Sequence, residues 1–216
     1  MTTWLVDAIL FDLDGTLVDS AGSVQRSWRR LAEKINRPWP EVEPHIHGVP
    51  VAQVMAMLEP DMPAERVEEL REFMVESEST DTVGVVAQPS AAEVLAALPP
   101  ERVAIVTSGG VRLAGSRMAA AGLPTPAVVV TADDVPVGKP DPAPYLKGAA
   151  LLGFPPARCL VVEDAPAGVS SAKAAGCPVI GVLTTHDVLD APSVHSLADI
   201  RFSTVDGGIE VTIQGT

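Results

Sequence analysis

Four acidic residues, in two pairs far apart in the chain, directly follow apolar runs of strand length. Asp12 and Asp14 follow the first such run, and Glu163 and Asp164 follow a later one. Because ligands of α/β sheets bind at the carboxyl ends of the strands, both pairs are expected at one rim. Acids gathered there would repel one another, and a hard cation such as Mg²⁺, which prefers carboxylate and carbonyl oxygens, would relieve that repulsion. The two pairs therefore predict a magnesium site.

Two further segments could bind an anion at the same rim. Thr107, Ser108 and Gly109 follow another apolar run, where hydroxyl and main-chain N–H groups can contact a phosphate. Lys139 lies in a Gly-Lys-Pro loop, whose rigid flanks suit a cation that screens a carboxylate from a phosphate. Each segment alone also fits a plain alternative: a solvated Asp-x-Asp-Gly turn, a helix start, a solvated lysine, or, for Asp164, a helix N-cap.

Alternating strand and helix patterns must position these residues. The expected strands are Val6–Asp12, Val103–Val106, Ala127–Val130, Leu160–Val162 and Val179–Leu183, with Ile200–Val205 as a weaker sixth. The expected helices are Ser90–Leu98, Arg112–Ala121, Pro142–Leu152 and Pro166–Ala175. This alternation, with strands that are apolar throughout, predicts an α/β fold with a doubly wound, mostly parallel sheet buried on both faces.

One region breaks this rhythm, because no convincing strand lies between Ser20 and Thr80. Its helical patterns cover Ser20–Asn36, Val51–Leu58 and Ala64–Glu78. We therefore expect an α/β core of residues 1–18 and 84–216, interrupted by a helical insert of residues 19–83. The structure of the short tail after Asp206 is left open.

The bulk composition excludes several classes of protein. Hydrophobic residues make up 47% of the 216 residues and charged residues 20%, which fits a folded chain and not a disordered one. A net charge of −13 without a basic stripe disfavours nucleic acids and anionic membranes as partners. Because the sequence shows neither a signal peptide nor a long apolar span, we expect a cytoplasmic protein. Cys159 and Cys177 are expected to be reduced core residues.

The four motif segments, in this order and each after a strand, resemble the haloacid-dehalogenase superfamily. The resemblance covers essentially the whole chain, and residues 19–83 resemble the small α-helical cap of that superfamily. It implies a Rossmann-like sheet with a helical cap domain. Two parts of the chain look like the subgroup that acts on sugar and polyol phosphates, such as 2-deoxyglucose-6-phosphate and glycerol phosphate phosphatases. The first is Thr131–Val135 with Gly138–Pro142 and Pro144–Gly148, and the second is Glu163–Gly168 with Lys173–Cys177.

The resemblance implies a magnesium-dependent phosphoric monoester hydrolase acting on a small phosphorylated metabolite. Asp12 would attack phosphorus and form an aspartyl-phosphate, while Asp14 would protonate the leaving alkoxide and then help to activate water. The metal would be held by the Asp12 carboxylate, the Asp14 carbonyl and Asp164, with Glu163 assisting directly or through water. The residues assigned to phosphate or substrate binding are Leu13, Thr16, Thr107, Ser108, Gly109, Lys139 and His47. Because a general acid must be protonated near neutral pH, Asp14 is expected in a drier place than Asp12.

Other functions remain open at this point. A hexose phosphate mutase of the β-phosphoglucomutase type uses the same acid pair but usually needs extra cap cations, and Val49–Val51 supplies none. A dehalogenase would not need the metal-binding acids, and a phosphonatase would need a cap lysine, for which Lys34 is the one candidate. A non-catalytic binding protein would be expected to have lost a motif acid or Lys139.

The insert itself is harder to interpret. His45 and His47 have a zinc-like spacing, but no third ligand is apparent. Trp28, Trp39 and Met55 are expected to pack within the insert. We expect a monomer or a weak homodimer.

Overall fold

The computed structural model describes residues 1–46 and 51–213. The chain divides into two compact units, one made of Met1–Asp19 with Val86–Thr216 and the other of Ser20–Val85. The sequence predicts borders after residues 18 and 83, and the two units meet after Asp19 and after Val85.

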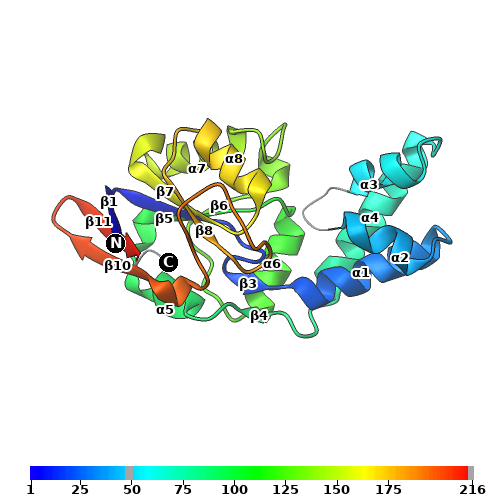
Figure 1. Cartoon of the computed structure of the whole chain (residues 1–216), viewed down its shortest axis with the longest axis horizontal. Helices are drawn as coiled ribbons and strands as arrows, with labels where there is room; N and C mark the ends of the chain where they lie inside the picture. The colour runs from blue at the N-terminus through cyan, green and yellow to red at the C-terminus, as the bar shows by residue number, and fades with distance from the viewer. Residues whose placement is uncertain (47–50, 214–216) are drawn as a thin grey trace. The chain divides into compact units, whose positions relative to one another are not determined.

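A six-stranded parallel sheet forms the centre of the larger unit (Figure 1). Its order is β6-β5-β2-β7-β8-β9. The strands are β2 (Ala8–Phe11), β5 (Val103–Val106), β6 (Val128–Val130), β7 (Cys159–Glu163), β8 (Val179–Val182) and β9 (Ser193–Val194). Because β2 pairs in parallel with β5 on one side and β7 on the other, the carboxyl ends of these three strands meet at one rim.

Helices and a second sheet cover the two faces of this sheet. The helices are α5 (Ala91–Ala97), α6 (Val111–Ala120), α7 (Ala143–Leu152) and α8 (Pro166–Ala174), with 3-10 turns η2 (Pro100–Arg102), η3 (Ala132–Asp134), η4 (Pro156–Arg158) and η5 (Leu197–Asp199). Helices α7 and α8 lie on the same face (Figure 1), where Leu10 and Val161 pack with Tyr145. On the other face the ring of Phe11 lies 6.0 Å from that of Phe202. Burial on both faces explains why the central strands are apolar throughout.

The second sheet is antiparallel and has the order β1-β11-β10, with β1 at Thr2–Val6, β10 at Ile200–Val205 and β11 at Gly208–Ile213. Ile200–Val205 is therefore a strand, as expected, but it does not belong to the parallel sheet. The sixth parallel strand is β9, and the whole of β11 lies in the tail after Asp206. Strand β10 is only partly buried, which is typical of a sheet with one solvated face.

Helices and the loops between them make up the described residues of the smaller unit. It contains α1 (Ala21–Lys34), α2 (Trp39–Val42), η1 (Glu43–His45), α3 (Val51–Leu58) and α4 (Ala64–Thr80). Its core includes Trp28 and Met55, with Trp39 packed against it, as the sequence predicted. The chain leaves and re-enters the larger unit through β3 (Val18–Asp19) and β4 (Val86–Ala87), which pair antiparallel.

Two further sequence-based expectations can be compared with the structure. Cys159 and Cys177 are both free and buried, as predicted. Among the described helices, none combines the length and the apolar character needed to cross a bilayer.

Candidate active site

Asp12 extends the central strand by one residue. Its N–H donates to the Val162 carbonyl at 3.0 Å, so the backbone is held by β7. The residue is 7% exposed, and its Oδ1 accepts a hydrogen bond from Lys139 at 2.6 Å. Burial raises the pKa of the Asp12 carboxyl well above its ordinary value, against the opposing effect of the Lys139 charge. A largely buried acid with a cation at 2.6 Å is suited to act as a nucleophile towards an anion.

Lys139 connects the ends of three neighbouring strands. Its Nζ donates to Asp12 Oδ1, to Glu163 Oε1 at 2.7 Å and to the Val106 carbonyl at 2.9 Å. The side chain is 4% exposed, and its peptide bond to Pro140 is cis. Burial alone would lower the pKa of Lys139, but the charges of Asp12 and Glu163 outweigh it and raise the pKa above its ordinary value. The ammonium group is therefore held charged beside Asp12.

Glu163 is fully engaged with protein donors. Its Oε1 accepts from Lys139 and from the Tyr145 hydroxyl at 3.0 Å, while its Oε2 accepts the N–H groups of Asp164 and Ala165 at 2.8 Å each. A Cβ atom on Gly168 would lie 1.6 Å from Oε1, so only glycine leaves room for this carboxylate. The contacts make Glu163 the counter-ion of Lys139 and the anchor of the turn into α8.

Asp164 lies beside the Asp12 carboxylate and is 3% exposed. The Thr16 hydroxyl donates to its Oδ1 at 3.1 Å, and the Thr185 hydroxyl donates to its Oδ2. Gly15 passes so close, with φ at +88°, that a Cβ atom there would lie 2.1 Å from Oδ2. Burial, followed by the charge of Glu163, raises the pKa of the Asp164 carboxyl to about 7.

These acids fit a hard divalent cation. Asp12, Glu163 and Asp164 each offer a carboxylate oxygen within 4.8 Å of the others, and all three residues are buried. Oxygen donors of this kind suit Mg²⁺, which is usually bound by one or two carboxylates and retains several waters. Lys139 balances only part of the charge of three buried acids, so a cation would stabilise the ionised cluster.

Asp14 is more exposed than the sequence predicted. Its side chain is 27% exposed against 9% for Asp12, so the expectation of a drier Asp14 is wrong. The reason is local: Asp12 prolongs a buried strand, whereas Asp14 lies in the turn beyond it. Asp14 forms an ion pair that the sequence did not predict: Arg117 Nη1 lies 2.5 Å from Asp14 Oδ1.

Arg117 belongs to no sequence motif, so motifs alone do not identify it as a site residue. The buried residues of α6 are Leu113, Ala114, Arg117 and Met118, so the arginine occupies the apolar stripe of the helix. A charged residue in such a stripe is the signal that could have revealed it, because a buried charge requires a partner.

The residues assigned to phosphate binding do not share one environment. Thr107 is buried at the end of β5, with its hydroxyl accepting the Gly109 N–H at 3.0 Å, and Ser108 is exposed beside it. The Leu13 side chain is fully buried, which leaves its main chain for binding. Thr16 is also fully buried and orients Asp164. His47 lies outside the described residues. So do Val49 and Pro50, two residues of the Val49–Val51 stretch that supplies no cation in the insert.

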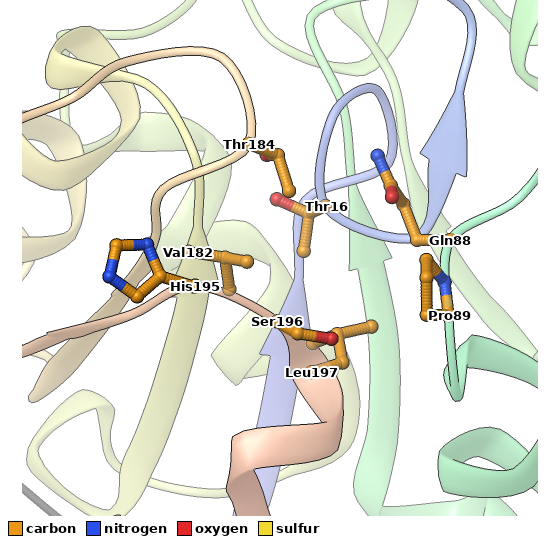
Figure 2. Close-up of a pocket in the computed structure, with 8 residues that line it drawn as sticks. All are labelled: Thr16, Gln88, Pro89, Val182, Thr184, His195, Ser196 and Leu197. Atoms are coloured by element: carbon orange, nitrogen blue, oxygen red, sulfur yellow. The ribbon is translucent and has the colours of Figure 1, made fainter.

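A small cavity lies beside Thr16, between Gln88 and Thr184 (Figure 2). Its volume is about 90 Å³, well below the roughly 300 Å³ at which ligand pockets begin. Gln88 and Thr184, which line it, donate to the Gly15 carbonyl at 3.2 and 2.6 Å. The other lining residues are Thr16, Pro89, Val182, His195, Ser196 and Leu197. The cavity therefore lies next to the side chains that hold the Gly15 carbonyl in place. It is too small for a sugar phosphate.

Known proteins resemble this chain in sequence and in fold. Residues 6–176 match the haloacid dehalogenase-like hydrolase family. The chain is 44% identical to hexitol phosphatase A of Escherichia coli over 95% of its length and 97% of that protein. It is 35% identical to glycerol-1-phosphate phosphohydrolase 2 of Saccharomyces cerevisiae, over 85% and 77% of the two chains. The structure resembles a hydrolase from Pseudomonas syringae with a TM-score of 0.72 and 30% identity, over 83% and 85% of the chains.

Proposed function

The chain belongs to the haloacid dehalogenase-like hydrolase family, and from this premise we propose that it is a phosphatase acting on a small phosphorylated polyol or sugar. The observation that carries the proposal is the position of Lys139, whose ammonium lies 2.6 Å from Asp12 Oδ1. A carboxylate can attack a phosphate dianion only if charge repulsion is reduced, and a fixed buried cation does this.

We assign the nucleophile to Asp12 and the acid–base role to Asp14. An Asp12 oxygen would form a bond to phosphorus while the bond to the substrate oxygen breaks, and the departing alkoxide would take a proton from Asp14. Asp14, now a carboxylate, would accept a proton from the water that attacks the aspartyl-phosphate. Inorganic phosphate would leave and the Asp12 carboxylate would be restored.

The remaining polar groups would bind the substrate phosphate. We propose this role for Lys139, for the Thr107 hydroxyl and for the main-chain N–H groups near Leu13 and Ser108. Mg²⁺, held by Asp12, Asp164 and the Asp14 carbonyl, would neutralise charge on the transferred phosphoryl group. Glu163 and Thr16 would support this arrangement by orienting Lys139 and Asp164.

The proposed substrate class comes from the relatives. Hexitol phosphatase A and glycerol-1-phosphate phosphohydrolase 2 both carry the names of phosphorylated polyols. Every motif residue described above lies in the larger unit, so we propose that the helical unit, Ser20–Val85, serves as the cap and selects among such substrates.

Phosphate release tests this proposal directly. The full-length protein would be incubated with hexitol phosphates, glycerol 1-phosphate, sugar phosphates and nucleotides, in Mg²⁺ or in EDTA, and free phosphate measured colorimetrically. Asp12→Asn should abolish release, whereas Asp190→Asn, at a side chain that is 96% exposed, should leave it unchanged. Isomerisation of a hexose phosphate without release of phosphate would instead indicate a mutase, and turnover by Asp12→Asn would refute the nucleophile.

A further inference from the structure

The two acids of the catalytic turn are paired with different cations from different elements. Asp12 contacts Lys139, from the loop before α7, whereas Asp14 contacts Arg117, from α6. The Arg117 side chain is 4% exposed and its Nη1 lies 2.5 Å from Asp14 Oδ1. The guanidinium group therefore reaches the turn from inside the larger unit.

Stability alone gives no reason for an arginine at this position. The other buried residues of the helix are Leu113, Ala114 and Met118, so a leucine or methionine would continue the apolar stripe. Replacing a buried ion pair by well-packed apolar side chains is often neutral or stabilising, because desolvation of the charges offsets their attraction. The arginine needs another explanation, and the residue it contacts suggests one.

Asp14 needs to be held in place. It lies in a turn and its side chain is 27% exposed, so without a partner its carboxyl group would rotate among several rotamers. A proton can be transferred to a leaving oxygen only from about hydrogen-bond distance, and small displacements of such a group cost rate. Arg117 contacts Oδ1 of Asp14, and a carboxyl group that accepts a hydrogen bond on one oxygen can still carry a proton on the other. The guanidinium group can therefore fix the orientation of Asp14 in both of its protonation states.

We propose that Arg117 is a positioning residue for the acid–base step, which orients the Asp14 carboxyl group towards the oxygen of the leaving alcohol. This inference rests on the proposed phosphatase activity and on the acid–base role of Asp14 within it. Arg117 itself touches neither substrate nor metal in this assignment. Its loss should therefore affect a reaction that needs protonation of the leaving group more than one that does not.

A polyol phosphate and 4-nitrophenyl phosphate differ in whether the leaving group needs a proton. The alkoxide that leaves from glycerol 1-phosphate, or from whichever polyol phosphate is turned over fastest, must be protonated, whereas 4-nitrophenolate leaves without help. For Arg117→Met we expect kcat/KM to fall about 100-fold on the polyol phosphate and less than about 3-fold on 4-nitrophenyl phosphate, since acid–base catalysis typically contributes about 100-fold or more. Arg117→Lys should recover part of the loss. Arg112→Met, at an exposed position on the same helix, is the matched control and should leave both rates unchanged.

The role of Asp14 is measured in parallel. Asp14→Asn should show the same selective loss, and the double variant Asp14→Asn with Arg117→Met should lose little more than Asp14→Asn alone, because coupled residues are not additive. Circular dichroism and thermal unfolding would establish that each variant is folded.

The outcomes distinguish a failure of the Arg117 role from a failure of the proposed phosphatase activity. Equal losses on both substrates for Arg117→Met, or no loss on either, would overturn the positioning role while leaving the phosphatase proposal intact. A wild-type protein that releases phosphate from neither substrate would instead refute the proposed function, and the role of Arg117 with it. If Arg117→Met does not fold, Arg117→Lys must still show a larger loss on the polyol phosphate than on the aryl phosphate.

Discussion

The affinity of this protein for Mg²⁺ should depend steeply on pH, because one proposed ligand is buried and holds a proton near neutrality. Burial raises the pKa of Asp164 from 3.8 to about 7. A magnesium ligand must be deprotonated, so binding competes with that proton. With this pKa the acid is ionised in ~90% of molecules at about pH 8 and in ~10% at about pH 6. We therefore expect the apparent affinity for Mg²⁺ to fall about tenfold between these two pH values.

The same shift makes a prediction for stability. Between about pH 4 and about pH 7 the folded chain keeps a proton on Asp164 that the unfolded chain has lost, so stability without metal falls as the pH rises through this window. A rise in pKa from 3.8 to about 7 corresponds to roughly 4 kcal/mol. Mg²⁺ binds the ionised form, so it should restore this loss above about pH 7 and have little effect near about pH 5.

Calorimetric titration with Mg²⁺ and thermal unfolding in Mg²⁺ or EDTA would measure both effects. Asp164→Asn should abolish the Mg²⁺-dependent rise in Tm at high pH, while Asp190→Asn, at an exposed position, should retain it. Equal Mg²⁺ affinity at about pH 6 and about pH 8 would refute the reasoning, as would full binding by Asp164→Asn. Either result would mean that this carboxyl group is not the titrating ligand.

Two further predictions concern the support of the cluster. Lys139→Met should leave the buried acids Asp12 and Glu163 without their cation. We expect it to abolish activity and to lower the free energy of unfolding, measured in urea, by about 3 kcal/mol or more. Lys173→Met, at a surface position, should change neither quantity. Gly15→Ala should weaken Mg²⁺ binding at least about tenfold in calorimetry, because its Cβ atom would displace an Asp164 ligand oxygen. Gly153→Ala, which has a similar positive φ but open space at Cβ, should leave Mg²⁺ binding unchanged.

The parallel sheet and its catalytic rim could be predicted because the relevant signals are local. A buried parallel strand is a continuous apolar run, and β2, β5 and β7 each show one directly before a motif. Since the carboxyl ends of parallel strands meet at one edge, Asp12, Thr107 and Asp164 could be expected at one rim. Lys139 lies in the loop before α7, and the family resemblance was needed to place it beside Asp12. The helical insert was similarly visible as a long stretch without strand patterns.

The antiparallel sheet could not be predicted in the same way. Strand β1 pairs with β11, which places Thr2 opposite Ile213, and no local pattern reports a partner at that separation. Strand β9 has only two residues, too few to show a periodicity. The pattern of Ile200–Val205 therefore identifies a strand but not the sheet to which the strand belongs.

Strand alternation would have separated the roles of two adjacent acids. Successive side chains of a strand face opposite sides, so Glu163 and Asp164 cannot both project as Asp12 does. Val161 packs with Tyr145 on the α7 side of the sheet, and Glu163, two residues later, reaches the same tyrosine. The alternation therefore directs Glu163, like Asp12, towards Lys139. Asp164 lies beyond the last residue of β7, where the hydroxyls of Thr16 and Thr185 orient it.

The buried cluster of Asp12, Glu163 and Asp164 carries more negative charge than Lys139 can neutralise. Ionised Asp12, Glu163 and Asp164 carry three negative charges, and Lys139 carries one positive charge, which its contact with Glu163 at 2.7 Å neutralises locally. Two negative charges then remain on Asp12 and Asp164, where burial makes an uncompensated charge costly. Either protons or a divalent cation can compensate these two charges. Without a cation the acids hold their protons more tightly, which is why the pKa values of Asp12 and Asp164 are raised. A chain that used these residues only to stabilise its fold would be more stable with fewer acids at this rim, so the surplus of negative charge is itself an argument for a bound cation.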